Sequence, residues 1–167
     1  KRDLLIVVGG GSLPPQLYDR PHEDELQPNR DRMEEQVIHY CVAHGIPIIA
    51  TCRGMQYINV MFGGKLWYHP KLPVNRTRGV DHQVWLVKEQ RNIWVNNYHS
   101  DCIYEEGLAS CFEPLAIDRE NHVVEAYGSD EMKILALQWH PERRFETANA
   151  YEETRKIILD FIQKYVK

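Results

Sequence analysis

The segment that decides the fold of this 167-residue chain is Ile46-Pro47-Ile48-Ile49-Ala50-Thr51-Cys52-Arg53-Gly54-Met55-Gln56-Tyr57-Ile58-Asn59. Its first half is a short, β-branched apolar run, which is typical of a buried strand, and its second half has the pattern of a helix. Cys52 lies where the strand turns into the helix, and the dipole and free N–H groups at a helix N-terminus favour a thiolate. The pattern therefore predicts a nucleophilic Cys52. A cysteine that only fills the core at the end of a strand is an equally good interpretation of this segment alone.

A second apolar strand leads to a histidine and a carboxylate. The segment is Ile134-Leu135-Ala136-Leu137-Gln138-Trp139-His140-Pro141-Glu142, and its proline prevents the strand from continuing. Glu142 is near enough in sequence to reach back to the imidazole of His140, fix its tautomer and stabilise its charged form. Ligands of open α/β sheets bind outside the carboxyl ends of the strands, so we expect Cys52 and His140 to meet there.

Three consecutive glycines follow the first strand, in the segment Leu4-Leu5-Ile6-Val7-Val8-Gly9-Gly10-Gly11-Ser12. Glycines permit positive φ and leave N–H groups free, which suits an oxyanion hole or a phosphate cradle. A glycine run on its own is more often a turn, and this one lacks the Lys-Ser/Thr ending of a P-loop and the spacing of a dinucleotide fingerprint. Beside the cysteine and histidine segments, it is predicted to supply half of an oxyanion hole.

These three segments, in this order, resemble the class I glutamine amidotransferase-like superfamily with its Cys-His-Glu triad. Within the superfamily the chain most resembles the γ-glutamyl-γ-aminobutyrate hydrolase (peptidase C26) family, over essentially its whole length. The further motifs that carry the resemblance are Leu17-Tyr18, Arg30-Asp31 followed by Glu34, Asn59 with Gly63-Gly64, Val95-Asn96-Asn97-Tyr98-His99, and Val123-Val124-Glu125-Ala126. The resemblance implies an α/β fold of the flavodoxin-like, three-layer α/β/α kind, with a mostly parallel central sheet and a small antiparallel strand region.

The resemblance also implies the chemistry. Cys52 would be the nucleophile, His140 the base and Glu142 the orienting carboxylate in the cleavage of a γ-glutamyl amide through a thioester, with no cofactor and no metal. Backbone N–H groups near Gly10 and of Arg53 would form the oxyanion hole. The residues expected to bind the γ-glutamyl substrate are Gly11, Gln56, Asn97, Tyr98 and His99. For the loop that carries the last three, a solvated turn is an equally good interpretation.

The composition fits one soluble domain that spans residues 1–167, with 43% hydrophobic and 26% charged residues. No segment has the length of a membrane span, no signal peptide is visible, and the net charge of −4 does not indicate binding to nucleic acid or membranes. The four cysteines (Cys41, Cys52, Cys102, Cys111) and eight histidines lack metal-type spacing. We therefore expect reduced thiols, a cytoplasmic protein and a small-molecule partner, and whether the chain forms a homodimer stays open.

Strands are expected at about 4–8, 46–51, 83–87, 93–95, 114–117, 122–126 and 133–138, and helices at about 30–44, 53–62 and 149–165. Asn29 is the expected cap of the first helix. Cys41 lies on the apolar stripe Met33, Val37, Cys41 and His44 of this helix, so we expect it in the core. Members of the family usually carry a further strand and helix before the glycine strand. We therefore expect these to be absent from the given chain, which would expose a strand edge.

Three classes of function fit this pattern. The first is a hydrolase that acts alone, the second is a glutamine amidotransferase that delivers ammonia to a partner synthase, and the third is a non-catalytic binding protein; the motifs favour the hydrolase. The candidate substrates are γ-glutamyl-γ-aminobutyrate and γ-glutamyl-CDP-amidate. For an anionic leaving group, the basic residues Lys71, Arg76 and Arg78 are the expected contacts.

Overall fold

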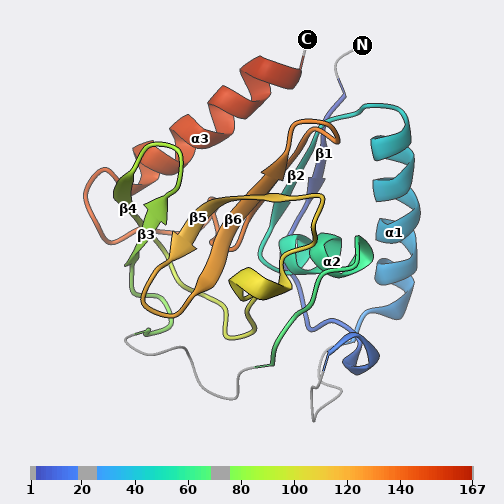
Figure 1. The fold of residues 1–167 in the computed structure, drawn as a ribbon, viewed down its shortest axis with the longest axis horizontal. Helices are drawn as coiled ribbons and strands as arrows, with labels where there is room; N and C mark the ends of the chain where they lie inside the picture. Colours follow the sequence, from blue (N-terminus) through green and yellow to red (C-terminus); the bar gives the residue numbers. More distant parts are fainter. Residues whose placement is uncertain (1–2, 19–25, 69–75, 167) are drawn as a thin grey trace.

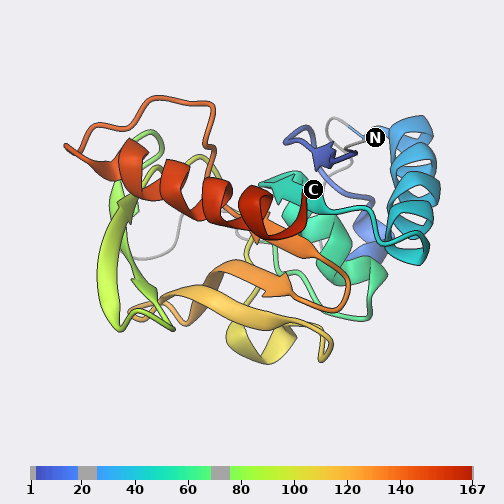
Figure 2. The same cartoon turned by 90° about the horizontal axis from the view of Figure 1, so that it is seen from above.

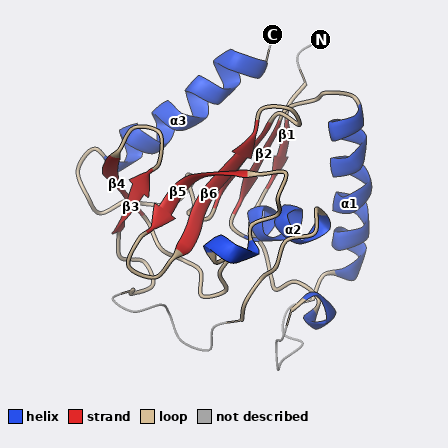
Figure 3. Ribbon diagram, viewed as in Figure 1, coloured by secondary structure: helices blue, strands red, loops and turns tan. Residues whose placement is uncertain are grey.

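The computed structural model describes residues 3–18, 26–68 and 76–166. These residues form one seven-stranded sheet with the strand order β1-β2-β7-β6-β5-β3-β4 (Figure 1). The strands are β1 (Leu5–Val7), β2 (Ile48–Thr51), β3 (His82–Leu86), β4 (Arg91–Val95), β5 (Glu113–Asp118), β6 (Val123–Ser129) and β7 (Ile134–Leu137). The helices are α1 (Pro28–Ala43), α2 (Arg53–Met61) and α3 (Ala150–Tyr165) (Figure 3). Every expected element is present.

The parallel part of the sheet consists of β1, β2 and β7. Leu5 pairs with Ile48, and Ile48 pairs with Ile134 on its other side. The four residues of β2 and the four of β7 are all buried, which explains why both read as unbroken apolar runs. Because the three strands run in the same direction, the residues that follow them, among them Gly9, Cys52 and His140, emerge at the same edge of the sheet.

The antiparallel part is larger than the sequence indicated. β6 pairs antiparallel with β7, and β5, β3 and β4 continue the sheet in antiparallel pairs. The connections within the consecutive pairs β3–β4, β5–β6 and β6–β7 are short, as between Ser129 and Ile134, and a short connection permits only antiparallel pairing. At the other end of the described sheet, β1 forms the edge, and Ile6 and Val8 are exposed there.

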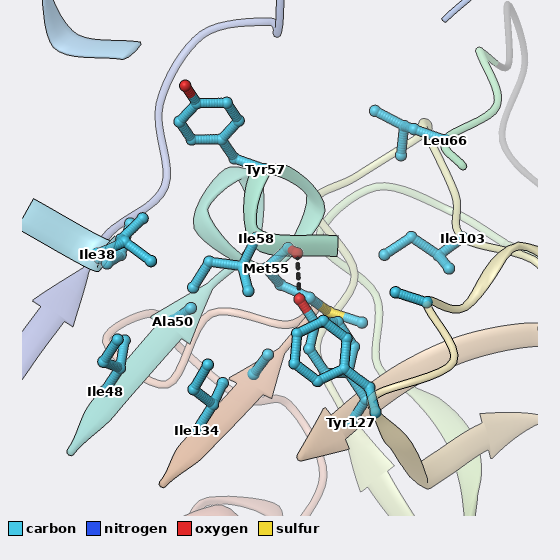
Figure 4. Close-up of a cluster of buried hydrophobic side chains, with 14 of the residues drawn as sticks. Ile38, Ile48, Ala50, Met55, Tyr57, Ile58, Leu66, Ile103, Tyr127 and Ile134 are labelled. Atoms are coloured by element: carbon cyan, nitrogen blue, oxygen red, sulfur yellow. Dashed lines mark hydrogen bonds between the residues drawn. The ribbon is translucent and has the colours of Figure 1, made fainter. Parts of the chain in front are cut away.

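Helices cover both faces of the sheet, as expected for a three-layer fold. On one face, α1 and α2 pack against β2, β6 and β7 (Figure 4); Ile58 of α2 lies near Ile48 and Ile134, and the hydroxyl of Tyr127 donates to the carbonyl oxygen of Met55 at 2.6 Å. On the other face, α3 contributes Phe161 to a second cluster. Figure 2 shows this helix on one side of β5 and β6. The core therefore lies in two layers that hold the parallel strands between them.

Helix α1 corrects two expectations. It begins at Pro28 with Gln27 as its cap, so Asn29 is inside the helix. Proline suits the first helical position because its fixed φ and missing N–H carry no penalty there. Cys41 is buried as expected, but Met33 and Val37 are 58% and 39% exposed, and the buried apolar side chains of the helix are Ile38 and Cys41. The stripe read from the sequence was therefore partly wrong.

The end of α2 follows the sequence. Its C-terminal turn closes with N–H bonds from Gly63 to the Val60 carbonyl and from Gly64 to the Asn59 carbonyl, and Gly63 has a φ of 90°. This is the Schellman arrangement, in which glycine accepts the left-handed conformation without strain. In the described ranges, none of the helices is both long enough and apolar enough to cross a bilayer.

Candidate active site

Cys52 occupies a sharp corner between β2 and α2. It is the N-cap of α2, with φ 49° and ψ −110°, and its N–H donates to the Leu137 carbonyl of β7 at 2.8 Å. A Cβ added at Gly54 would lie 2.5 Å from the Val7 carbonyl oxygen, so only glycine lets α2 approach β1 this closely. The strand-to-helix corner predicted from the sequence is confirmed, and its strain lies on Cys52 itself.

His140 lies close to the same corner. Its Nδ1 donates to Oε1 of Glu142 at 2.5 Å, which leaves Nε2 as the ring atom that can accept a proton. A Cβ added at Gly9 would lie 2.9 Å from Cε1 of His140 and 3.6 Å from Cβ of Cys52, so Gly9 lies beside both residues. The end of β1 therefore needs a residue without a side chain where it passes the cysteine and the histidine.

The backbone of His140 is held by a residue that the sequence did not single out. Asn96, which is completely buried, accepts the His140 N–H at 2.9 Å and donates to the His140 carbonyl oxygen at 2.8 Å. The ring of Tyr98 packs edge-on against the imidazole, with ring centroids 5.7 Å apart. Both contacts come from the segment after β4. In the sequence Asn96 was part of the family motif Val95-Asn96-Asn97-Tyr98-His99, as one of a polar pair directly after an apolar strand, but no role was predicted for it.

The electrostatics of Cys52 and His140 differ from the sequence-based expectation. Burial raises the pKa of the Cys52 thiol, against the opposing effects of His99 and the Arg53 N–H. Burial also lowers the pKa of His140, and Glu142 opposes this. The expectation that the helix N-terminus lowers the pKa of Cys52 is therefore wrong, because burial outweighs it. A Cys52 thiol with a raised pKa would need a neighbouring base to take its proton before it could attack a substrate.

Cys52 opens into a pocket of about 190 Å³. Seven of the predicted site residues line it: Gly10, Gly11, Cys52, Arg53, Gln56, Tyr98 and His99. Arg78 and Asp101 complete its charged lining, together with Ser12 and Ser100. Asn97 does not line the pocket; it is completely buried, and its amide donates to the Thr77 carbonyl oxygen at 3.3 Å. The substrate contact predicted for Asn97 therefore has the least structural support.

Gln56 contacts other pocket groups through its amide. Its nitrogen donates to the Asp101 carbonyl oxygen at 3.1 Å and to the side-chain oxygen of Gln138 at 3.2 Å. These two bonds use both amide hydrogens and fix the orientation of the side chain. Gln56 is therefore rigid in the pocket, one helical turn after Cys52.

His99 is buried, so the interpretation of its loop as a solvated turn is wrong. Its Nδ1 lies 3.0 Å from the Asp101 carbonyl oxygen and its Nε2 lies 3.3 Å from Oε1 of Glu125. Both neighbours are acceptors, which indicates that both ring nitrogens carry protons. Burial opposes this charge, but the Glu125 carboxylate outweighs it and raises the pKa of His99 well above its usual value. His99 thus places a fixed positive charge in the pocket lining.

Glu125 belongs to a buried charged cluster with Arg76, Asp118, His82 and His99. Arg76 pairs with Asp118 and lies 3.0 Å from Glu125, and the Nε2 atom of His82 lies 3.7 Å from Glu125. Arg76 therefore does not face the pocket, whereas Arg78 does; Lys71 lies outside the described residues. The signal for such a cluster in the sequence was Glu125 itself, a charged residue between the apolar residues Val124 and Ala126. In the part of the chain that the structure describes, no group of three or more His, Cys, Asp or Glu side chains is arranged to hold a metal ion.

Comparisons with known proteins indicate the family to which the chain belongs. The model of the peptidase C26 family matches residues 1–142. The glutamine amidotransferase-like protein YvdE of Lactococcus lactis is 30% identical over 164 residues, which cover 87% of this chain and 68% of that protein. The gamma-glutamyl-gamma-aminobutyrate hydrolase PuuD of Escherichia coli K12 is 28% identical over 169 residues, covering 85% and 65%. The chain thus spans about two thirds of the length of these curated relatives.

The fold is also found among solved structures. A glutamine amidotransferase from Thermotoga maritima superposes with a TM-score of 0.61 at 19% identity, over 95% of this chain and 64% of that one. At this identity the likeness concerns the fold alone. It agrees with the α/β class and the arrangement of helices on both faces of the sheet. Since the family model covers most of the sequence, the chain belongs to the peptidase C26 family.

Proposed function

We propose that this chain hydrolyses a γ-glutamyl amide, with Cys52 as nucleophile, His140 as general base and acid, and Glu142 as the carboxylate that orients His140. The observation that carries the proposal is the strained cysteine at a strand-to-helix corner, beside a histidine whose Nδ1 is bonded to a carboxylate. This is the arrangement of an activated nucleophile. The name of the relative PuuD, a gamma-glutamyl-gamma-aminobutyrate hydrolase, supports the same reaction class.

In the first half of the reaction, Nε2 of His140 takes the thiol proton while the sulfur of Cys52 attacks the δ-carbonyl carbon of the substrate. The carbonyl electron pair moves to oxygen, and the N–H groups of Gly10 and Arg53 stabilise the resulting oxyanion. When the tetrahedral intermediate collapses, the C–N bond breaks and His140 gives its proton to the departing amine. The enzyme then holds a γ-glutamyl thioester.

In the second half, His140 takes a proton from water, and the hydroxide attacks the thioester carbon. Collapse of this second intermediate breaks the C–S bond, and His140 returns the proton to the sulfur. The products are glutamate and the free enzyme. The two halves of the reaction together consume one water per amide and require no redox partner or cofactor.

The charges of the pocket suit the amino-acid end of a γ-glutamyl group. That end carries a carboxylate and an ammonium, and the lining offers the His99 imidazolium for the first and Asp101 for the second. We assign Gly11, Gln56, Tyr98 and His99 to this binding role. A volume of about 190 Å³ is below the range of about 300–1,000 Å³ usual for ligand sites. The pocket would therefore hold the glutamyl group, with the leaving group outside.

The leaving group proposed is either γ-aminobutyrate or a CDP-amidate. Both leaving groups are anionic. We propose that Arg78, a cation in the pocket lining, attracts them. The Nη1 atom of Arg78 donates to the Tyr98 carbonyl oxygen at 3.0 Å, which fixes the position of this charge. A screen for glutamate release from γ-glutamyl-γ-aminobutyrate, glutamine and γ-glutamyl-CDP-amidate tests the proposal. We expect turnover of at least one non-glutamine conjugate by the chain alone, and none by Cys52→Ala.

The second candidate is an amidotransferase, which the name of the relative YvdE favours. An amidotransferase would release ammonia from glutamine only in the presence of its synthase partner, because docking completes the site. Glutaminase activity that depends on a copurifying partner, with no cleavage of other γ-glutamyl amides, would favour the amidotransferase and contradict the hydrolase proposal. Wild-type protein that cleaves none of the three substrates, with or without a partner, would remove both.

A further inference from the structure

We propose that Arg30 and Glu34 of α1 are positioning residues that hold both donors of the oxyanion hole in place. The inference rests on the proposed function, since it concerns the N–H groups of Gly10 and Arg53. It gives a role to the Arg30-Asp31 and Glu34 motif, which the triad does not use. Neither residue lines the pocket, so both would act through the backbone of other residues.

The first half of the device is the contact between Arg30 and the glycine run. Its guanidinium donates to the Val8 carbonyl oxygen at 2.7 Å and to the Gly9 carbonyl oxygen at 3.1 Å. The peptide bond between Gly9 and Gly10 is trans, so its N–H points opposite to its carbonyl. By binding the Gly9 carbonyl, Arg30 turns the Gly10 N–H away from α1. Gly10 itself lines the Cys52 pocket.

The fit between Arg30 and the glycine run is tight. A Cβ added at Gly10 would lie 2.2 Å from Nη1 of Arg30 and 3.1 Å from Cδ of Arg53. The two arginine side chains thus pack directly on the backbone of Gly10. Among the described residues, no hydrogen bond engages the Gly10 N–H, so this donor remains available to a ligand.

The second half of the device is the contact between Glu34 and Arg53. Oε2 of Glu34 accepts from Nη1 of Arg53 at 2.6 Å, and Oε1 of the same carboxylate accepts from Nε of Arg30 at 2.6 Å. Asp31 also pairs with Arg53, whose side chain is almost completely buried. Glu34 therefore links Arg30, which binds the backbone of the glycine run, to Arg53, which follows Cys52. The Arg53 N–H lies next to the Cys52 sulfur, whose charged form it favours.

The charges explain why a carboxylate is needed at this point. Burial, and secondarily the neighbouring Arg30, lower the pKa of Arg53 to about 10. Without Glu34, two guanidinium groups would face each other with only Asp31 to neutralise them, and each would be free to shift. An oxyanion donor acts only if it is fixed before the reaction, because movement of the donor during the reaction cancels its benefit.

The test is Glu34→Gln, which keeps the shape of the side chain but removes its charge. Loss of one oxyanion donor typically lowers kcat by about 10²–10³-fold, so partial misplacement of two donors is expected to lower kcat by roughly 10–100-fold, with KM changed by less than about threefold. Alkylation of Cys52 by iodoacetamide forms no oxyanion, so its rate should stay within about twofold of wild type. Arg30→Lys, which keeps the charge but cannot bind both carbonyls in the same fork, should show the same split.

The matched control is Glu153→Gln, which removes one partner of an exposed pair between Arg91 of β4 and Glu153 of α3 and should change neither rate. Unchanged kcat in Glu34→Gln, in a protein whose wild type cleaves a γ-glutamyl amide, would overturn the positioning role and leave the proposed function intact. Equal losses in turnover and in alkylation, with a lowered unfolding midpoint, would also overturn it, because they indicate a general collapse of the site. Absence of wild-type turnover would instead count against the proposed function.

Discussion

At Cys52 the backbone takes φ 49° and ψ −110°, a conformation that costs a non-glycine residue on the order of 1–3 kcal/mol. The packing of α2 on β1 and the bond from the Cys52 N–H to β7 hold the residue in this state. The corner thereby presents the sulfur to the pocket, while burial keeps it protonated until a base acts on it.

Replacing Cys52 tests this description. Cys52→Ala keeps the Cβ, so the backbone strain and the fold should be unchanged, while turnover should fall to background because the nucleophile is gone. A γ-glutamyl chloroketone should modify Cys52 in preference to Cys111, the exposed cysteine, and to the buried Cys41 and Cys102. Peptide mass spectrometry reads the site of modification. Glutamate release by Cys52→Ala would contradict the role of Cys52.

The pKa of His140 gives a second prediction. Turnover requires a neutral imidazole, and burial lowers the pKa of His140 below its usual value of about 6.5. The acid limb of the kcat/KM profile should therefore have its midpoint below pH 6.5. Glu142 is the group that raises this pKa, so Glu142→Gln should move the midpoint to still lower pH and also lower the plateau, because the ring loses its orienting partner. A midpoint that rises in Glu142→Gln would assign the acid limb to another group.

At the scale of elements, the site depends on how closely α2 and β1 approach each other. Gly54 of α2 lies against the backbone of Val7 in β1, and Gly9, just after β1, lies against the ring of His140, which follows β7. A backbone neighbour cannot move aside as a flexible side chain can. The distance between the elements, and hence the position of the cysteine, is therefore set by the absence of two side chains.

Gly54→Ala should strongly destabilise the protein. The added Cβ would lie 2.5 Å from the Val7 carbonyl oxygen, so the helix must shift, and overpacking of this kind costs about 1–3 kcal/mol. Gly63→Ala is the control, because its Cβ would meet nothing within 4 Å and only the φ of 90° is unfavourable there. Urea unfolding should show a smaller loss of roughly 1 kcal/mol for the control. A midpoint of Gly54→Ala equal to that of the wild type would show that α2 shifts at no cost.

At the scale of the whole molecule, the buried cluster around Glu125 joins the antiparallel part of the sheet to the pocket. Glu125 lies on β6, Asp118 ends β5, Arg76 precedes β3, and His99 follows β4. Each group is buried, so none is stable there without the others. The charge that the pocket receives from His99 thus depends on the correct assembly of four separate segments.

Glu125→Gln should therefore lower the free energy of unfolding by roughly 3–5 kcal/mol near neutral pH, because it leaves the buried His99 cation without its carboxylate partner. The His99 pKa is raised, so its contribution is present below the unfolded pKa and is lost as pH rises through the folded value. The Glu125 pKa is depressed, so its contribution is present above the unfolded pKa and is lost as pH falls through the folded value. Denaturant unfolding of both proteins as a function of pH measures this difference.

The difference in the free energy of unfolding between wild type and Glu125→Gln should be largest between the folded-state pKa of Glu125 and the folded-state pKa of His99. It should shrink at lower and at higher pH. The exposed pair variant Glu153→Gln should lose at most about 1 kcal/mol at every pH. A loss for Glu125→Gln as small as that of the control would show that the buried cluster does not stabilise the fold.

The sequence by itself determined the elements and the local part of the site. The strand-to-helix corner at Cys52, the glycine end of α2 and the reach of Glu142 to His140 all depend on residues a few positions apart, where propensity and chain geometry decide the outcome. For the same reason the α/β class and the order of elements followed from apolar patterns. The boundaries of α1 did not, because its exposed and buried faces depend on which neighbours it meets.

Only the tertiary structure decided the rest. The bonds of Arg30 to the Val8 and Gly9 carbonyls, the clamp of Asn96 on His140, and the partnership of His99 with Glu125 join positions that are distant in sequence. The pKa of Cys52 was also decided by the tertiary structure. The sequence indicated a helix N-terminus, which lowers this pKa, but the burial that raises it exists only after the elements have packed. Burial and long-range charge pairing depend on all the elements at once, so no local pattern contains them.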